Sequence, residues 1–396
     1  MENEKRPVIR FKSFTDDWEK KRAKELFRST ADKGYPELPV LSATQDRGMI
    51  RRDENRINVF HDTRNETGYK RVLPGQFVIH LRSFQGGFAH STIEGITSPA
   101  YTVFGFTEPE KHNSEYWKYI FTSKAFIKRL ETVTYGIRDG RSISYNEFLN
   151  LYFTFPHQKE QSKIARYLDE LSALIVMHQS KYNNLQNMKK ACLEKMFPRN
   201  GSNAPEIRFQ GFTDELSCCK AAKIFSSTVD KGHPELPVLS ATQDRGMIRR
   251  DENSISIFHD KKNETGYKRV MPGQFVIHLR SFQGGFAHSA IEGITSPAYT
   301  VFGFMEPEKH DSEYWKYIFT SSVFIKRLET VTYGIRDGRS ISYEEFLTLD
   351  FSFPGKEEQT QIAQYMNKLN DLIILHKNEI EKLKNIKKSL LEKMFV

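Results

Sequence analysis

The sequence of 396 residues has no long apolar run and only three cysteines. No stretch approaches the roughly 18 consecutive apolar residues of a membrane-spanning helix. The amino terminus lacks the charged-then-apolar segment and cleavage site of a secretory signal. Cys192, Cys218 and Cys219 are odd in number and have no CxxC spacing, which argues against a disulfide framework or a zinc site. We therefore expect a protein of the reducing cytoplasm.

Short catalytic motifs are absent as well. The sequence has no GxxxxGK phosphate loop, no FxGxG loop with an NPPY or DPPY tetrapeptide for methyl transfer to an amino group, and no HExxH. The segment HDTRNETG at 61–68 holds the residue types of a His/Asn nuclease, but such side chains in polar turns more often make turn hydrogen bonds. We expect no catalytic residue, metal or other cofactor in this chain. An enzyme with an unrecognised site is the alternative.

The charge of the chain favours one class of partner. The formal net charge is +9 and the pI is about 9.1. A basic balance of this size is typical of proteins that bind polyanions, nucleic acid above all, although many solvated surfaces are basic too.

The chain is a tandem duplication. The stretch ATQDRGMIRRDEN at 43–55 recurs unchanged at 241–253, and an offset of 198 aligns the two halves without a gap. Residues 36–148 differ from the second copy at 12 of 113 positions, whereas 157–197 keeps only 18 of 41. A recent copying event would produce the same unevenness, so identity alone does not establish that function preserved the middle segment.

Each half begins with a pattern typical of a sheet. The runs at 39–44, 56–60, 75–81 and 101–106 are rich in β-branched and aromatic residues and are separated by turn residues. Residues 114–132 then have apolar side chains at helical spacing, with Ser114 as the expected N-cap. Residues 149–155 return to a strand pattern. The spacing predicts an α+β domain built around a mostly antiparallel sheet.

A heptad stripe follows each sheet domain. Apolar residues and a few others recur at intervals of 4 and 3 from Ile164 to Met196, and again from Ile362 to Met394. We predict two long helices that pack on each other as an antiparallel coiled coil, which would give the chain pseudo-two-fold symmetry. The alternative is that each stripe covers the core of its own domain. His178 and His376 lie on the stripe, where a buried polar residue can fix the register.

These patterns divide the chain into four segments. We expect recognition domains at 1–156 and 199–354, a central spacer helix at 157–198 and a C-terminal spacer helix at 355–396.

The opening and closing segments of each half resemble a known family. PVIRFKSFTDDWEKKRAKELF at 7–27 and PEIRFQGFTDELSCCKAAKIF at 205–225 are similar to the start of a target-recognition domain in the specificity subunit of type I restriction–modification systems. FPHQKEQSKIARYLDEL and FPGKEEQTQIAQYMNKL are similar to that family's entry into its spacer helix, and LKNIKKSLLEKMF to its exit. The resemblance covers the whole chain. Leu216 in place of Trp18, and Cys218-Cys219 in place of charged residues, are local departures.

Three segments of each domain contain side chains suited to DNA. Arginine and glutamine can read base edges in the major groove, while most protein–DNA hydrogen bonds go to phosphate and sugar. Glycines beside them would allow close approach of the backbone. The alternatives are a solvated hairpin, internal salt bridges to Asp139, and a solvated charged loop. The candidate residues are Gln45, Arg47, Arg51, Arg52, Arg82, Gln85, His90, Tyr135, Arg138, Arg141 and Ser142, with their counterparts Gln243, Arg245, Arg249, Arg250, Arg280, Gln283, His288, Tyr333, Arg336, Arg339 and Ser340.

The resemblance implies a function without catalysis in this chain. It implies a DNA-recognition subunit that assembles with two methyltransferase subunits, and with motor and endonuclease subunits in the full complex. S-adenosylmethionine, Mg²⁺ and ATP would belong to those partners. A free-standing DNA-binding regulator is the alternative. If the helices pair antiparallel, two near-identical readers would meet inverted half-sites, so we expect an interrupted palindrome as the target.

Overall fold

The chain forms two compact units in the computed structural model. Unit 1 combines Met1–Gln179 with Asn378–Val396, and unit 2 is Ser180–Lys377. The residues described are 6–44, 47–55, 63–80, 87–130, 134–135, 142–198, 204–242, 245–253, 261–278, 285–328, 332–333 and 340–395. Each unit therefore contains one sheet domain and parts of both long helices. No helix of these residues is long and apolar enough to cross a membrane.

The sheet domain of unit 1 precedes its long helix. Its elements are β1 (Glu19–Arg22), α1 (Ala23–Leu26), β2 (Phe27–Thr30), β3 (Leu41–Thr44), β4 (Gly48–Arg51), β5 (Lys70–Val72), β6 (Phe77–Ile79), β7 (Phe88–His90), β8 (Gly95–Thr97), β9 (Thr102–Phe106), α2 (Ser114–Thr122), α3 (Lys124–Leu130), β10 (Thr134–Tyr135), β11 (Ser142–Ile143), α4 (Tyr145–Phe148) and β12 (Tyr152–Phe155). A four-stranded sheet in the order β2-β9-β6-β7 is central, and β1-β12, β3-β4, β5-β8 and β10-β11 form pairs. All of these pairings are antiparallel.

Unit 2 repeats this arrangement in its own sheet domain. Its elements are β13 (Ser217–Lys220), β14 (Phe225–Thr228), β15 (Leu239–Thr242), β16 (Gly246–Arg249), β17 (Lys268–Val270), β18 (Phe275–Ile277), β19 (Phe286–His288), β20 (Gly293–Thr295), β21 (Thr300–Phe304), α6 (Ser312–Thr320), α7 (Ser322–Leu328), β22 (Thr332–Tyr333), β23 (Ser340–Ile341), α8 (Tyr343–Leu347) and β24 (Asp350–Phe353). The central sheet has the order β14-β21-β18-β19. The sequence prediction of two α+β domains with mostly antiparallel sheets is confirmed.

Alternation along the strands gives the central sheet two apolar faces. Phe77 and Phe104 join a large aromatic cluster with Trp117 of α2, whereas Val78 and Val103 join a smaller aliphatic cluster. Successive side chains of a strand point to opposite faces, so a run of consecutive apolar residues becomes buried on both sides. The aromatic face carries α2 and α3, and this fixes where the helical layer lies.

The segment predicted as one helix at 114–132 forms two helices instead. Ser123 has an extended backbone (φ −71°, ψ 145°), and its Oγ accepts a hydrogen bond from Phe126 N at 3.2 Å at the start of α3. The N-cap of α2 is Asn113, not Ser114, because the Asn113 side chain accepts from Tyr116 N. The apolar spacing continues through the break, which is why periodicity alone did not show it. The predicted strand at 56–60 lies outside the described residues.

The long helices begin at a buried Glu-Gln pair. They are α5 (Gln158–Lys195) and α9 (Lys356–Lys393). Arg10 Nε and Nη2 donate to the two carboxylate oxygens of Glu160, both at 2.7 Å. Gln161 Oε1 accepts from Asn113 N at 2.9 Å and from Trp117 Nε1 at 3.2 Å. Unit 2 has the same Arg–Glu pair between Arg208 and Glu358. Each domain is thereby fixed to the first turn of its own helix.

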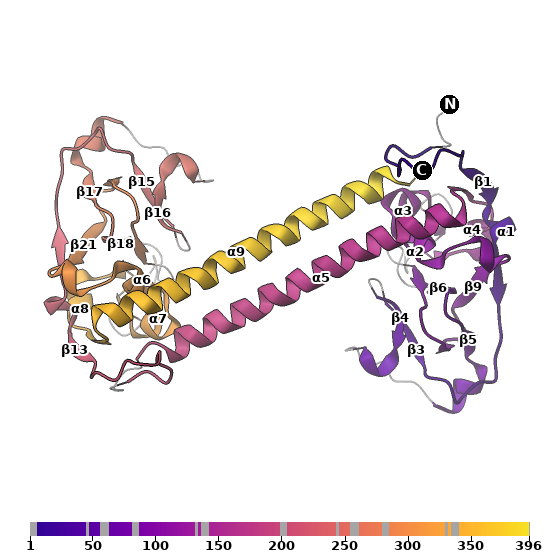
Figure 1. Cartoon of the computed structure of the whole chain (residues 1–396), viewed down its shortest axis with the longest axis horizontal. Helices are drawn as coiled ribbons and strands as arrows, with labels where there is room; N and C mark the ends of the chain where they lie inside the picture. The colour runs from indigo at the N-terminus through magenta and orange to yellow at the C-terminus, as the bar shows by residue number, and fades with distance from the viewer. Residues whose placement is uncertain are drawn as a thin grey trace. The chain divides into compact units, whose positions relative to one another are not determined.

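In each unit the start of one long helix packs against the end of the other. Figure 1 shows α5 and α9. Ile164 and Leu168 of α5 share the aromatic core of unit 1 with Met394, which follows α9, and Lys387 Nζ lies 2.8 Å from Ser172 Oγ. The order of these contacts is antiparallel, as predicted. The alternative is also partly right, because the first turns of the stripe do cover their own domain.

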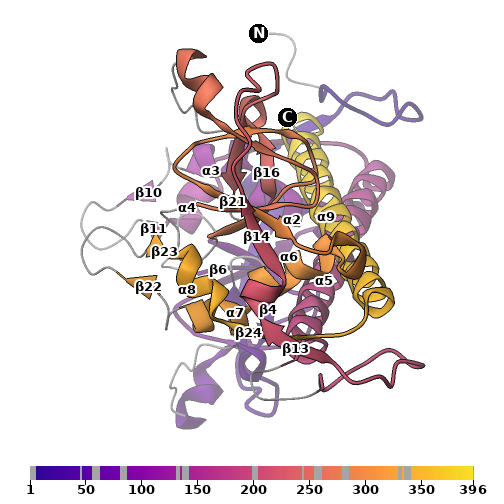
Figure 2. The same ribbon diagram turned by 90° about the vertical axis from the view of Figure 1, so that its left-hand side faces the viewer.

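Unit 2 repeats the contacts with the two halves exchanged. Tyr116 of α2 packs on Phe395, with ring centroids 5.3 Å apart, and Tyr314 of α6 packs on Phe197 at 5.2 Å. Ile9 N donates to Lys393 O, and Ile207 N donates to Lys195 O, each at 2.9 Å. Figure 2 shows α6 of unit 2 beside α9. The Tyr317 hydroxyl of α6 donates to Asn367 Oδ1 of α9 at 2.6 Å. Each domain thus needs residues from both halves of the sequence.

We predict that replacing Arg10 with methionine destabilises unit 1. The change leaves the Glu160 carboxylate, only 1% exposed, buried without its partner. Loss of one member of a buried ion pair typically costs about 3–5 kcal/mol. The measurement is chemical denaturation followed by circular dichroism.

Two variants control this experiment. Arg6→Met removes an exposed pair with Asp17, both more than half exposed, and should change stability little. The double variant Arg10→Met/Glu160→Met should recover most of the loss, because both charges are then absent. An Arg10→Met variant as stable as Arg6→Met would contradict the role assigned to the pair.

Candidate DNA interface

The hairpin of β3 and β4 presents the repeated motif. Thr44 Oγ1 donates to Gly48 O at 2.8 Å and accepts from Arg47 N at 3.1 Å, which closes the turn. Gly48 has φ +68°, and a Cβ at this position would lie 2.3 Å from the carbonyl oxygen of His90. Only glycine fits there. The turn therefore rests against the end of β7, and the Arg47 side chain is exposed beside it.

The two arginines that follow this turn, Arg51 and Arg52, differ in their exposure to solvent. Arg51 is exposed at the end of β4, and Arg52 is half-buried at the start of the next turn. Nε and Nη1 of Arg52 are buried and have no hydrogen-bond partner among the described residues. In unit 2, Arg250 Nη1 is likewise unpartnered, while its Nε lies 3.5 Å from Ser240 Oγ. Buried donors without acceptors are costly, so this position suits a ligand that supplies an acceptor.

His90 occupies a more enclosed position than its sequence context indicates. Its side chain is 5% exposed, its ring centroid lies 5.1 Å from that of Phe77, and its Nδ1 lies 3.7 Å from Glu115 Oε1. Burial lowers the pKa of His90 and outweighs the opposing effect of Glu115. Burial likewise lowers the pKa of His288 to about 4. Both imidazoles are therefore neutral at pH 7. Contact between His90 and DNA stays a prediction.

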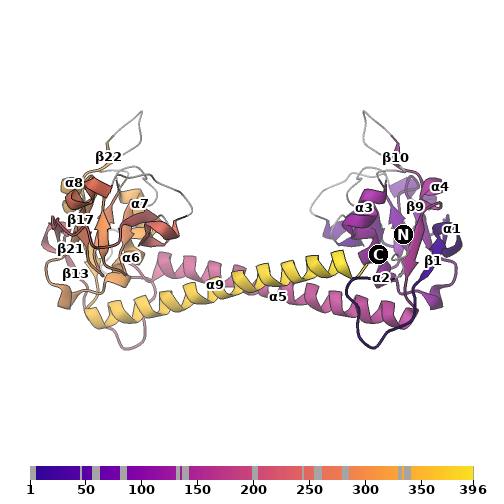
Figure 3. The ribbon, with the colours of Figure 1, turned by 90° about the horizontal axis from the view of Figure 1, so that it is seen from above.

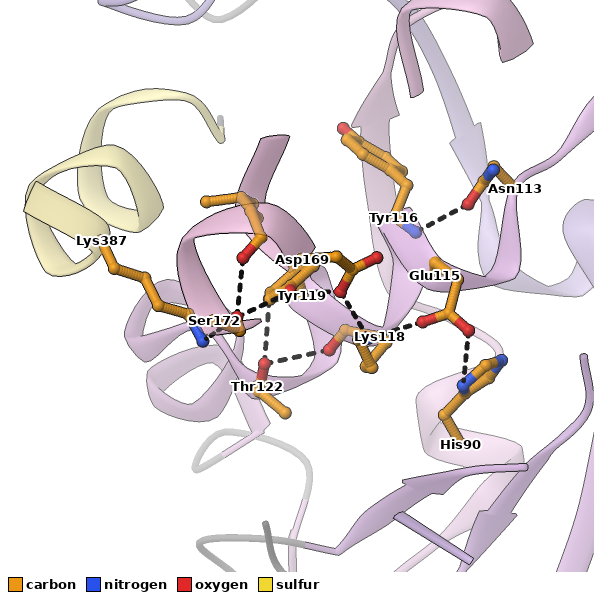
Figure 4. Close-up of polar contacts among 11 residues, drawn as sticks. His90, Asn113, Glu115, Tyr116, Lys118, Tyr119, Thr122, Asp169, Ser172 and Lys387 are labelled. Carbon is orange, nitrogen blue, oxygen red and sulfur yellow. Dashed lines mark hydrogen bonds and ion pairs between the residues drawn. The ribbon is translucent and has the colours of Figure 1, made fainter. Parts of the chain in front are cut away.

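A chain of polar contacts runs from His90 to α9 (Figure 4). Glu115 pairs with Lys118 at 2.5 Å, and Lys118 pairs with Asp169 of α5 at 3.0 Å. Tyr119 donates to Asp169 at 2.6 Å, and its hydroxyl lies 3.3 Å from Ser172 Oγ. These residues line a cavity of about 430 Å³ that also includes Arg47, His90 and Lys387.

Sequence reasoning missed most of this chain of contacts. Lys118, Tyr119 and Asp169 come from elements far apart in sequence, and only the fold brings them together. One signal was available, since Lys387 and its counterpart Lys189 are lysines on an otherwise mostly apolar stripe. In unit 2, Asn367 and Asn370 replace Asp169 and Ser172, and both bond to the Tyr317 hydroxyl.

The other predicted residues differ in how much of them the structure describes. Tyr135 and Ser142 are opposite each other in the β10–β11 pair, as Tyr333 and Ser340 are in β22–β23, and only their backbones are described. Arg245 and Arg249 occupy the same exposed positions in unit 2 as Arg47 and Arg51 in unit 1. Outside the described residues lie Gln45, Arg82, Gln85, Arg138, Arg141, Gln243, Arg280, Gln283, Arg336 and Arg339.

Other kinds of site find little support. Within the described ranges there is no group of three or more His, Cys, Asp or Glu side chains placed to hold a metal ion. Of the segment considered for a nuclease, residues 61 and 62 lie outside the described part, and Thr63–Gly68 forms a 3-10 helix. His178 is half-buried on α5, as expected for a stripe position.

Comparisons with known proteins identify the fold. No protein-family model and no curated protein sequence matches the chain. Among solved structures, the S subunit of a type I restriction–modification system from M. genitalium matches with a TM-score of 0.57 and 13% identity, over 99% of each chain. The HsdS subunit from Thermoanaerobacter tengcongensis gives a TM-score of 0.47 at 14% identity, over 96% of each chain. The chain therefore has the fold of a type I restriction–modification S subunit, with two repeated halves that each consist of a sheet domain and a long helix.

Proposed function

We propose that this chain is the DNA sequence-recognition subunit of a type I restriction–modification complex. The observation that carries the proposal is the full-length fold match, which spans 99% of both chains and includes both domains and both helices. The basic charge of the chain and its arginine-bearing hairpins agree with a DNA partner.

Within each domain, we assign the repeated hairpin and the two neighbouring candidate segments to DNA contact. Arg82 and Gln85, with Arg280 and Gln283, would read base edges, whereas Arg138 and Arg141 would contact phosphate first. Arg52 and Arg250 are the best supported by geometry, because each has a buried guanidinium nitrogen without an acceptor among the described residues. A phosphate or base oxygen would supply that acceptor.

Methyl transfer and cleavage would be carried out by other chains. We propose assembly with two methyltransferase subunits, which would bind S-adenosylmethionine, and with motor and endonuclease subunits that would use ATP and Mg²⁺. A free-standing DNA-binding regulator is the second candidate, because the hairpin arginines would serve it equally well.

Co-purification separates these candidates. The tagged chain, expressed in its source cell, should bring down a protein that carries an NPPY or DPPY motif, and the pair should transfer methyl groups from S-adenosylmethionine to adenine in DNA. Tight, specific DNA binding by the chain alone, without such a partner, would favour the regulator. Methyl transfer by the purified chain alone would show that it is itself an enzyme.

The repeated contacts support a symmetric target. The Tyr116–Phe395 and Ile9–Lys393 contacts of unit 1 recur in unit 2 as Tyr314–Phe197 and Ile207–Lys195, with the two halves of the sequence exchanged, as a two-fold relation requires. Readers so related, and differing at 12 of 113 positions over residues 36–148, would meet inverted copies of one half-site. We propose an interrupted palindrome as the target of this chain.

We predict that replacing both Arg52 and Arg250 with methionine separates stability from DNA binding. The change removes buried, unpartnered donors, each of which costs about 1–3 kcal/mol, so the free protein should be at least as stable as wild type. Affinity for DNA should fall, because the arginines are proposed to find their acceptors there. Thermal denaturation and fluorescence anisotropy with duplex DNA measure the two effects.

The exposed neighbours Arg51 and Arg249 provide the control. Their replacement by methionine should leave stability unchanged and weaken binding to all sequences alike, as expected for phosphate contacts. If the Arg52/Arg250 variant lost stability while its DNA affinity stayed at the wild-type value, the two arginines would have a structural role only.

A fragment of residues 1–198 should form a dimer that recognises the parent target. It retains Met196 and Phe197, which are the counterparts of Met394 and Phe395 in the repeat. In the intact chain Met394 and Phe395 complete the core of unit 1. A second copy can therefore supply the missing helix end, with His178 near its own symmetry mate. Affinity should be lower than for the intact chain, because the covalent link is lost.

Light scattering and sequencing of sites methylated with the partner subunit test this fragment. A matched variant with Phe197→Ala should dimerise more weakly, since it removes the ring that would pack on Tyr116. A strictly monomeric fragment, or a dimer that modifies another motif, would contradict the exchange of helix ends.

A further inference from the structure

A group of lysines surrounds a cavity in unit 1, where the start of α3 meets the end of α9. The cavity has a volume of about 510 Å³, and apolar residues such as Ile175 and Leu391 form part of its lining. The lysine cluster that lines it consists of Lys124, Lys384, Lys387 and Lys388.

Most of this positive charge is not neutralised. Lys384 and Lys388 are exposed and have no ion-pair partner among the residues described in unit 1. Lys124 lies 3.7 Å from Glu392, but both side chains are largely exposed, at 76% and 47%. Such a pair contributes little and can exchange for another anion. The cavity thus carries four cations against one carboxylate.

Lys387 is held in place without a carboxylate partner of its own. Its Nζ lies 2.8 Å from Ser172 Oγ and 5.5 Å from the centroid of the Tyr119 ring. Burial lowers its pKa, as does the nearby charge of Lys118, and the charge of Asp169 opposes both effects. An anion beside Lys387 would favour its charged form, so this half-buried position is suited to receive one.

The lysine cluster is continuous with the candidate DNA contacts. Lys387 lines both this cavity and the cavity that contains Arg47 of the β3–β4 hairpin. Arg47 has no ion-pair partner among the described residues of unit 1, and the same hairpin leads to the unpartnered Arg52. Lys387 thus connects the lysine cluster to the cavity of Arg47, which is also lined by Glu115 and Asp169, both paired with Lys118.

Unit 2 has only part of this cluster. The counterparts of Lys387 and Lys388 are Lys189 and Lys190, but the counterparts of Lys124 and Lys384 are Ser322 and Gln186. The two units thus differ by two positive charges at equivalent positions, although their hairpin motifs are identical.

We propose that the lysine cluster binds phosphates of the DNA backbone and gives unit 1 two contacts that unit 2 lacks. The inference rests on the proposed DNA-binding function. It implies that the two near-identical recognition domains contribute unequally to the affinity for DNA. Lysine contacts to phosphate carry no sequence information, so they would strengthen binding without changing the target. An acidic segment of a partner protein is the competing occupant, and continuity with the hairpin arginines favours DNA.

The test replaces the two unmatched lysines with the residues at the equivalent positions of unit 2. The variant Lys124→Ser/Lys384→Gln is compared with wild type for binding to a duplex that contains the mapped target and to a scrambled duplex, over a range of salt concentrations. We expect the slope of log K against log salt to fall by about 2, because each lost phosphate contact reduces it by about 1. The loss of affinity should be the same for both duplexes.

Two further variants have matched changes of charge. Ser322→Lys/Gln186→Lys adds the lysines to unit 2 and should steepen the slope by about 2. Lys12→Gln/Lys24→Gln removes two exposed lysines elsewhere in unit 1 and should leave it unchanged. Lys24 belongs to α1, which lies on the opposite side of the domain from α3 (Figure 3).

The outcomes separate failure of the proposed DNA-binding function from failure of the lysine-cluster assignment. A wild-type chain, free or with its partner subunits, that has no affinity for either duplex would overturn both the proposed function and this inference. Wild-type binding with an unchanged slope in the Lys124/Lys384 variant would overturn the inference alone. If that variant also lost its co-purifying partner, the cluster would be a docking site for an acidic protein segment. Equal thermal stability of all variants shows that the comparison reports binding.

Discussion

The buried ion pair at the first turn of each long helix is the contact on which the arrangement of each unit depends. Glu160 and Glu358 are almost completely removed from water, and the guanidinium of Arg10 or Arg208 donates to both carboxylate oxygens. Burying a carboxylate without such a partner is very costly. Loss of the ion pair would therefore favour separation of the first turn of the helix from its sheet domain. The neighbouring glutamine adds hydrogen bonds to the domain. Together they fix the direction in which each helix leaves its sheet.

That direction allows each helix to end in the core of the other half's domain. Phe395 packs on Tyr116 and Phe197 packs on Tyr314, so both domain cores are completed by the far end of the other helix. This exchange explains why the compact units do not coincide with the two sequence repeats. It also explains why 157–197 can differ at 23 of 41 positions from its copy while its last residues, Met196 and Phe197, match Met394 and Phe395.

The sequence pattern predicted the elements of this fold that depend on residues close together in the chain. Strands at 41–44, 77–79 and 102–106 and both long helices follow from alternation and heptad spacing. The break at Ser123 did not follow, because the apolar period continues on both sides and only backbone geometry reveals it. The enclosed position of His90 and the contacts of Lys387 were also missed, since they join residues that are distant in sequence. For the side chains proposed to contact DNA the sequence indicated residue types, and the fold adds that Arg52 and Arg250 have buried nitrogens without a partner among the described residues.

The central claim is that this chain reads one half-site twice. The most direct test is to map methylated adenines across a genome in cells that express the chain with its methyltransferase partner. The account predicts a single interrupted palindrome whose half-sites are centred about one helical turn apart or slightly more, so that both major grooves lie on one face. Two unrelated half-sites would contradict it, and would assign specificity to the 12 differing positions of residues 36–148, such as Arg56 and Ser254.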